Sequence, residues 1–275
     1  MEMILSISGL SKSFGRSILN RSGDQEFESN KVIDNLDVEI HKGEIACVVG
    51  GNGAGKSTLL NLIQNYTSSD SGSIDFLFNH KKIDLSTVLP FRMNKIGIGR
   101  LFQNKLVFKE LSVMDNMILG ASESKNSNPF FSVFNRKSVV KDEQNKMNKA
   151  ISIWSELFGS DNFLIKSIHK PAGTLSYGQQ RILAISRLLM GDYGLVILDE
   201  PTSGVDVEMI EVIRKLIMRF KSSQITVLIV EHNMDFVFDV ADRVLWMDGG
   251  KIRMDGTGKI LLENQEFQNT FLSYD

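Results

Sequence analysis

The sequence lacks the features of a disulfide-stabilised or zinc-stapled protein. Its 275 residues include one cysteine, Cys47. A single cysteine excludes an internal disulfide framework and a zinc site built from four cysteines. We therefore expect a reducing compartment, the cytoplasm, and we expect Cys47 to be an inert buried residue.

Long apolar runs are also missing. A helix that crosses a bilayer needs about 20 consecutive apolar residues, whereas the best runs here, Ile45–Val49 and Thr226–Val230, have the length of strands. Residues 1–10 alternate apolar and polar types without a basic start or a cleavage pattern, so we expect no secretory leader. Any role at a membrane is expected from outside the bilayer.

Neither sign of charge dominates. The chain carries 31 Lys and Arg residues against 33 Asp and Glu residues, a formal net charge of −2, so the overall balance does not favour nucleic acid or an anionic membrane. With 42% apolar and 23% charged residues the composition is that of a folded protein. Such a chain is long enough to build a large core.

Short unbroken apolar runs predict a parallel sheet. Ile45–Val49, Leu195–Leu198 and Thr226–Val230 are typical of strands buried on both faces. Apolar residues at helical spacing between the last two predict a crossover helix. These patterns together predict an α/β fold.

The amino-terminal part predicts antiparallel strands. Residues 3–8 and 32–40 show period-2 patterning, with one face of the second segment formed by Val32, Leu36, Val38 and Ile40. Residues 16–31 are polar and aperiodic, and they predict an extended surface loop. A partner-binding role for this loop is the alternative.

The middle of the chain breaks the alternation of strands and helices. Residues 141–158 carry apolar side chains at helical spacing, and they belong to a stretch that we expect to be a helical insertion. We accordingly expect a discontinuous core of residues 1–87 and 171–260, an insertion of residues 88–170, and a short C-terminal helix or tail of residues 261–275.

One glycine-rich segment carries a phosphate-binding pattern. Gly50–Ser57 follows a buried strand, opens a helix and matches G-x-x-x-x-G-K-[ST]. Glycines allow consecutive N–H groups to point at one anion, and the helix N-terminus adds partial positive charge. Lys56 is expected to reach the β- and γ-phosphates, and Ser57 to offer its hydroxyl to Mg²⁺. The predicted nucleotide contacts in this loop are Gly50, Gly51, Asn52, Gly53, Ala54, Gly55, Lys56, Ser57 and Thr58.

A second pattern places acids beside this loop. The strand Leu195–Leu198 runs into Asp199 and Glu200, at the carboxyl edge of a parallel sheet where ligands bind. Asp199 is expected to serve the Mg²⁺ shell, and Glu200 to act as the general base that polarises the attacking water. Taken alone, such acids could equally cap a helix.

These motifs resemble the nucleotide-binding subunit of ATP-binding-cassette (ABC) transporters, over nearly the whole chain. Leu175–Arg181 reads Leu-Ser-Tyr-Gly-Gln-Gln-Arg and is similar to the signature loop of that family, usually written LSGGQ, at its usual place before Asp199. The resemblance implies a P-loop NTPase fold of ABC type: a mainly parallel sheet core, an antiparallel β subdomain and a helical insertion. It also implies ATP and Mg²⁺ as cofactors and ATP hydrolysis as the reaction.

Other family elements follow in order. Gln103 resembles the glutamine that contacts Mg²⁺ and the attacking water, and His232 resembles the catalytic histidine on the γ-phosphate. Phe14 resembles the aromatic residue that stacks on adenine. In the family, each signature loop closes on the nucleotide of a second ATPase subunit, so a homodimer or related heterodimer is implied. The contacts implied across that dimer are Ser176, Gly178, Gln179 and Asp206, the last within Ser203–Asp206.

The resemblance also implies partners and a place of action. It implies separate membrane-spanning permease subunits, an optional solute-binding protein, and a peripheral position on the cytoplasmic face of the membrane. Gly97–Asn104 and Leu106–Asn116, with the Tyr177 form of the signature, are similar to subunits that import branched-chain amino acids. Three features depart from the family pattern: Gly51 replaces the commoner proline, Tyr177 replaces glycine, and the expected loop of residues 16–31 after Phe14 is not typical of the importer branch.

Three other functions are weighed against import. An ABC exporter ATPase stays open, and so does a soluble cassette protein acting on nucleic acid or ribosomes, although the net charge of −2 does not favour phosphate-backbone binding. A GTPase shares the phosphate loop, but Asn94–Gly97 lacks the aspartate of the guanine-reading N-K-x-D pattern.

Overall fold

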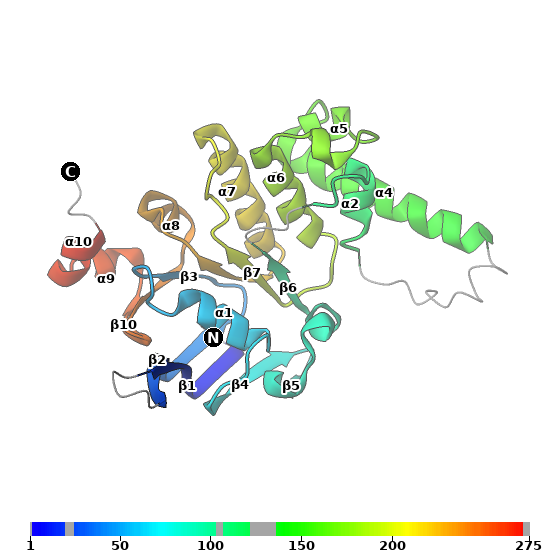
Figure 1. Cartoon of the computed structure of the whole chain (residues 1–275). Coiled ribbons are helices and arrows are strands. Elements are labelled where there is room, and N and C mark those ends of the chain that lie inside the picture. Colours follow the sequence, from blue (N-terminus) through cyan, green and yellow to red (C-terminus); the bar gives the residue numbers. More distant parts are fainter. Residues whose placement is uncertain (1, 20–24, 103–106, 122–135, 272–275) are drawn as a thin grey trace.

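The computed structural model describes residues 2–19, 25–102, 107–121 and 136–271, arranged as two sheets and the helices that cover them (Figure 1). The 4-stranded sheet is antiparallel and has the order β2-β1-β4-β5. Its strands are β1 (Met3–Leu19), β2 (Gln25–His41), β4 (Ser71–Phe78) and β5 (Lys81–Asp84).

The 6-stranded sheet has the order β10-β9-β3-β8-β7-β6. All neighbours in it are parallel except the β9–β10 hairpin. Its strands are β3 (Ile45–Val49), β6 (Ile98–Leu101), β7 (Leu195–Asp199), β8 (Thr226–Val230), β9 (Arg243–Asp248) and β10 (Lys251–Gly256). The expected α/β fold, with a mainly parallel core and an antiparallel sheet, is confirmed.

The large sheet is buried on both faces. In β3, Ile45 and Cys47 pack with the helices on one side, whereas Ala46 and Val48 pack with the antiparallel sheet and with α1 (Lys56–Ile63) on the other. Both faces of the strand therefore demand apolar residues, which is why it reads as an unbroken apolar run. Burial also raises the pKa of the Cys47 thiol, so this cysteine is unreactive.

Helices α6 (Tyr177–Leu188), α7 (Val207–Ser222) and α8 (Met234–Val240) cover the first face of the large sheet (Figure 1). The crossover helix predicted between the two buried strands is α7. Its buried stripe consists of Ile213, Leu216, Ile217 and Phe220.

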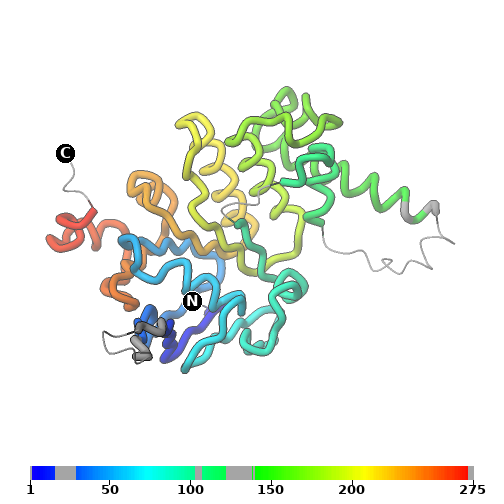
Figure 2. Tube along the Cα trace, viewed as in Figure 1, coloured from blue at the N-terminus to red at the C-terminus, as the bar shows by residue number. Residues whose placement is uncertain are grey.

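A helical segment lies at one end of the molecule, shown in green in Figure 2. It contains α2 (Val113–Ile118), α4 (Arg136–Phe158) and α5 (Phe163–Lys166). The stretch 88–170 is not helical throughout, because β6 within it pairs with β7 in the large sheet. The division of the chain into domains at residues 88 and 170 stays a prediction.

Short elements complete the chain. The 3-10 turns are η1 (Leu85–Thr87), η2 (Pro90–Ile96) and η3 (Ala172–Thr174). Helices α9 (Gly258–Leu262) and α10 (Gln265–Phe271) follow the β9–β10 hairpin. Phe267 of α10 is fully buried and packs edge-on against Trp246, which fixes the C-terminal helices to the body.

The surface loop expected at residues 16–31 is wrong over most of its length. β1 and β2 continue as one antiparallel ladder out to the pair Leu19–Gln25. Among the residues that the structure describes, β1 pairs with β2 alone from Ser13 onward. A ribbon of two strands does not have to bury one face, so its sequence needs no period-2 apolar pattern. The polar, aperiodic residues of this segment therefore did not predict strands.

One predicted face of β2 is also corrected. Leu36, Val38 and Ile40 are buried as expected, but Ile33 rather than Val32 is the buried residue before them. The register shifts near Leu10, and a left-handed residue, Asn35 with φ 47°, interrupts the strand. Such a bulge adds one residue and exchanges the two faces.

Candidate functional site

The phosphate loop is packed so closely that only glycine fits at two positions. A Cβ atom on Gly50 would lie 2.2 Å from the carbonyl oxygen of Met247. At Gly55 a Cβ would lie 2.7 Å from the carbonyl oxygen of Val32, and φ is +102°. The loop between β3 and α1 therefore takes its shape from β2 and β9.

Lys56 is folded over this loop. Its side chain is 7% exposed, and Nζ donates hydrogen bonds to the carbonyl oxygens of Gly50 at 2.6 Å and Gly51 at 2.9 Å. Burial lowers the pKa of Lys56, while the charges of Glu200 and Asp199 oppose that shift. An ammonium group held beside two carboxylates at a helix start is suited to phosphate binding.

The acids lie at the carboxyl edge of the large sheet, as predicted. Asp199 ends β7 and is 8% exposed. Its Oδ2 accepts a hydrogen bond of 2.9 Å from Nη2 of Arg100, whose Nη1 also lies 3.2 Å from Oδ1 of Asn61 in α1. Arg100 is thus a buried cation that joins β6, β7 and α1, and the sequence analysis gave it no role. An arginine within a strand-length apolar segment is the feature of the sequence that could have indicated it.

Glu200 and His232 face each other across the ends of β7 and β8. Nε2 of His232 lies 2.9 Å from Oε1 of Glu200. Glu200 adopts φ 47°, a left-handed conformation that costs energy in a residue other than glycine. Strained residues of this kind cluster at functional sites, so the two residues predicted to be catalytic are brought together.

The signature loop forms the start of α6. Ser176 caps the helix, and its Oγ accepts from the N–H of Gln179 while Oε1 of Gln179 accepts from the N–H of Ser176. One turn later, fully buried Arg181 donates to the carbonyl oxygen of Glu200 at 2.8 Å and to the hydroxyl of Tyr177. The signature helix is thus bonded to the loop that carries Glu200.

The remaining predicted residues are spread around these loops. Phe14 of β1 is 45% exposed, and Nζ of Lys12 lies 5.4 Å from its ring centroid. Asp206 is the N-cap residue of α7. Gly178 is buried against α7, where a Cβ would lie 3.2 Å from Met209. Gln103 lies outside the described residues.

The donor set fits a nucleotide and Mg²⁺. Gly50 and Gly55 allow the loop a curvature that any Cβ would block, as a phosphate cradle requires. The hydroxyl of Ser57 and the carboxylate of Asp199 are the hard oxygen ligands that Mg²⁺ takes. Within the described ranges no cluster of three or more His, Cys, Asp or Glu forms a metal cage, and Mg²⁺ is usually held by few side chains together with phosphates and water.

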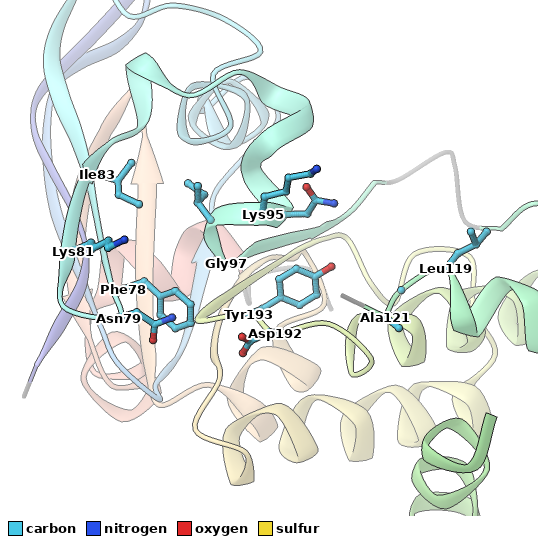
Figure 3. A pocket seen from close by; sticks show the side chains of 13 residues that line it. Phe78, Asn79, Lys81, Ile83, Lys95, Gly97, Leu119, Ala121, Asp192 and Tyr193 are labelled. Atoms are coloured by element: carbon cyan, nitrogen blue, oxygen red, sulfur yellow. The ribbon is translucent and has the colours of Figure 1, made fainter. Parts of the chain in front are cut away.

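A cavity of about 640 Å³ lies elsewhere (Figure 3). Its lining includes Phe78, Lys81, Lys95, Asp192 and Tyr193. These residues border the amino ends of β6 and β7, opposite the edge at which the acids lie. Ligands of open parallel sheets bind at the carboxyl ends of the strands, so this cavity is separate from the candidate site.

Comparison with known proteins identifies the family. The family described as ABC transporter matches residues 33–203. The probable branched-chain amino acid transport ATP-binding protein LivG of Methanocaldococcus jannaschii is 31% identical over 86% of this chain and 88% of its own. The xylose/arabinose import ATP-binding protein XylG of Sulfolobus acidocaldarius is 30% identical over 84% of each.

A solved structure agrees with the fold. The ADP conformation of MJ1267, an ATP-binding cassette of an ABC transporter, aligns with a TM-score of 0.75 and 28% identity, over 99% of this chain and 100% of that one. The phosphate loop, the acid-ended strand and the sheet order define a P-loop ATPase. The chain belongs to the ABC transporter family and is an ATPase of the ATP-binding-cassette type. In the part of the chain that the structure describes, no helix is long and apolar enough to cross a bilayer.

Proposed function

We propose that this chain is the ATP-hydrolysing subunit of a membrane importer for a branched-chain amino acid or a related small polar solute. The observation that carries the ATPase part is the Glu200–His232 pair, 2.9 Å apart, beside Lys56 and Asp199. The likeness to LivG supports the solute, and the likeness to XylG makes a pentose the competing solute.

Each residue has a separate role in hydrolysis. Lys56 and the N–H groups at the start of α1 bind the β- and γ-phosphates, and Phe14 stacks on the adenine. Ser57 and Asp199, with Gln103, would hold Mg²⁺, which neutralises the charge that develops on the phosphates. Glu200 accepts the proton of the attacking water, and His232 holds Glu200 and contacts the γ-phosphate.

Assembly completes the site. On this proposal a second ATPase subunit presents its nucleotide to the start of α6 and to the loop before α7, so closure of the dimer depends on ATP. The contacts are Ser176, Gly178, Gln179 and Asp206. The helical segment passes closure to separate permease chains at the cytoplasmic face of the membrane.

Glu200→Gln tests the chemical role. The amide cannot accept the proton, so steady turnover should fall by about 100-fold or more, whereas the dissociation constant for ATP should change by less than about twofold. Glu263→Gln, at an exposed position after α9, is the control. Wild-type turnover in Glu200→Gln would remove Glu200 from the role of base.

Copurification tests the biological role. We expect affinity purification from detergent-solubilised membranes to recover multi-span permease proteins with this chain. Uptake of labelled leucine that depends on the chain would support the amino acid solute, and uptake of labelled xylose would replace it. Recovery of ribosomes or nucleic-acid enzymes instead would contradict the transport role, and outward movement of the solute would identify an exporter.

A further inference from the structure

A second acid lies beside the catalytic pair. Glu231 follows β8 directly, precedes His232 and is 2% exposed. Its Oε1 accepts from the N–H of Thr202 at 2.8 Å and from the Thr202 hydroxyl. Its Oε2 accepts from the N–H of His232 at 2.7 Å and from that of Asn233 at 3.2 Å. Four donors fill the acceptor capacity of one carboxylate.

These donors belong to two different loops. Thr202 lies two residues after Glu200, in the loop that follows β7. His232 and Asn233 lie in the loop that follows β8, where the side chain of Asn233 accepts from the N–H of Phe236 and caps α8. Each loop thus contributes one member of the Glu200–His232 pair, and Glu231 bridges the two loops.

We propose that Glu231 is a positioning residue for ATP hydrolysis, which fixes the loop of Glu200 against the loop of His232. The inference rests on the proposed roles of those two residues. Glu200 has a left-handed backbone with φ 47°, and such a conformation persists only where its surroundings over-determine it. The two charge-assisted hydrogen bonds that Thr202 donates to Glu231 supply that constraint two residues away.

The bridge requires a carboxylate. In Glu231→Gln one side-chain oxygen becomes an NH₂ group, which cannot accept a hydrogen bond. Whichever way the amide is turned, one loop then meets a donor where it met an acceptor, and its buried N–H groups lose their partner. The 2.9 Å contact between His232 and Glu200 should lengthen, although neither residue has changed.

The first test compares Glu231→Gln with a matched control. We expect turnover to fall by about 10- to 100-fold, the scale of a 1 Å misplacement, while the dissociation constant for ATP changes by less than about twofold. Glu44→Gln is the control, because Glu44 is also largely buried and accepts from the N–H of His41 and from Arg243 outside the site. It should lower the melting temperature without lowering turnover. Equal turnover in the two variants would overturn the proposal.

A milder variant guards against misfolding. Thr202→Val removes the hydroxyl donor but keeps the N–H that bonds to Glu231. Turnover should fall by about 3- to 10-fold, the factor that corresponds to the net contribution of one typical hydrogen bond, with ATP affinity unchanged. Wild-type turnover in Thr202→Val would contradict the bridge even if Glu231→Gln does not fold.

A double-mutant cycle separates positioning from a general loss of structure. In a His232→Ala background the bridge can no longer set the Glu200–His232 contact but still holds the loop of Glu200, so adding Glu231→Gln should lower turnover by less than the factor of about 10 to 100 expected in the wild-type background. If Glu231→Gln lowered turnover by the same factor with and without His232, the proposal would be overturned. Failure of the proposed function would look different. In that case His232→Ala and Glu200→Gln would themselves leave turnover unchanged. If only the positioning role of Glu231 is wrong, those two variants lose turnover and the Glu231 variants keep it.

Discussion

Two helices start at phosphate-binding positions of the proposed site, and their first turns differ. α1 follows Gly55, and among the described residues no side chain caps its first turn. α6 follows Ser176, and a complete capping box with Gln179 satisfies its start at 3.3 Å and 3.0 Å. The first helix start exposes backbone donors to a ligand, whereas the second uses them within the chain.

The difference shows which half of the site is built in one chain. The shape of the α1 loop is enforced by glycine and by the neighbouring strands, so the backbone of this half of the site is formed within one chain. At the α6 start a phosphate oxygen must compete with Oγ of Ser176 for the N–H of Gln179. A neutral hydrogen bond is worth about 1 kcal/mol, so a second subunit can reopen this cap at small cost.

The capped start of α6 is connected to the loop that carries Glu200. Arg181 reaches from α6 to the carbonyl oxygens of Glu200 at 2.8 Å and Ser203 at 3.3 Å. A buried guanidinium bonded to two loop carbonyls makes a rigid connection. Movement of the α6 start on closure would therefore reach the backbone of Glu200 directly.

The largest effect on ATP affinity is expected from a substitution at the uncapped start of α1. Gly55→Ala places a Cβ 2.7 Å from the carbonyl oxygen of Val32 and 2.9 Å from Cε of Met247, at φ +102°. The loop must move, so ATP affinity should fall by about 100-fold or more, with about 2 kcal/mol or more of stability lost to strain and overpacking. Calorimetric titration and thermal melting measure the two losses.

Gly159→Ala is the control for backbone strain alone. Gly159 has φ +79°, lies after α4 away from the site, and has no atom within 4 Å of a built Cβ. It should cost about 1 kcal/mol of stability and leave ATP affinity unchanged. Gly55→Ala with wild-type affinity would show that the shape of the α1 loop does not govern nucleotide binding.

The next largest effect is expected when the cap at the start of α6 is removed. Ser176→Ala should cost about 1 kcal/mol, a fall in melting temperature of about 2–4 °C, and should lower turnover by about 10-fold through weaker contact with the partner's nucleotide. Ser112→Ala is matched to it, because Ser112 caps α2 with the same kind of box, formed with Asp115. Both variants should melt earlier, and only Ser176→Ala should lose turnover; equal turnover would reduce Ser176 to a helix cap.

The difference between the two helix starts was only partly predictable from sequence. The phosphate loop and the acids Asp199 and Glu200 follow from local spacing, because a buried strand and a helix start fix where their residues lie. The signature loop was found through family resemblance. Its capping box also has a local pattern, Ser176 followed by Gln179 three residues later.

Long-range partners could not be read from the sequence. Arg100 and Asp199 are 99 positions apart, and Thr202 and Glu231 are 29 apart. Each pair meets only because neighbouring strands end at the same sheet edge. The β1–β2 ribbon was missed for the opposite reason, since a two-stranded ladder needs no apolar period and leaves none in the sequence.

The smallest expected effect concerns Tyr177, which stands where the family more commonly has glycine. Tyr177→Phe removes the hydroxyl bonded to Arg181 but keeps the ring, whose centroid lies 5.3 Å from the guanidinium carbon. Arg181 retains its bonds to Glu200 and Ser203, so denaturant unfolding should show a loss of about 0.5–1 kcal/mol and turnover should stay within about threefold. A loss of turnover larger than that of Ser176→Ala would reverse the ranking: the Tyr177–Arg181 contact, rather than the cap, would then be what fixes the start of α6 against the catalytic loop.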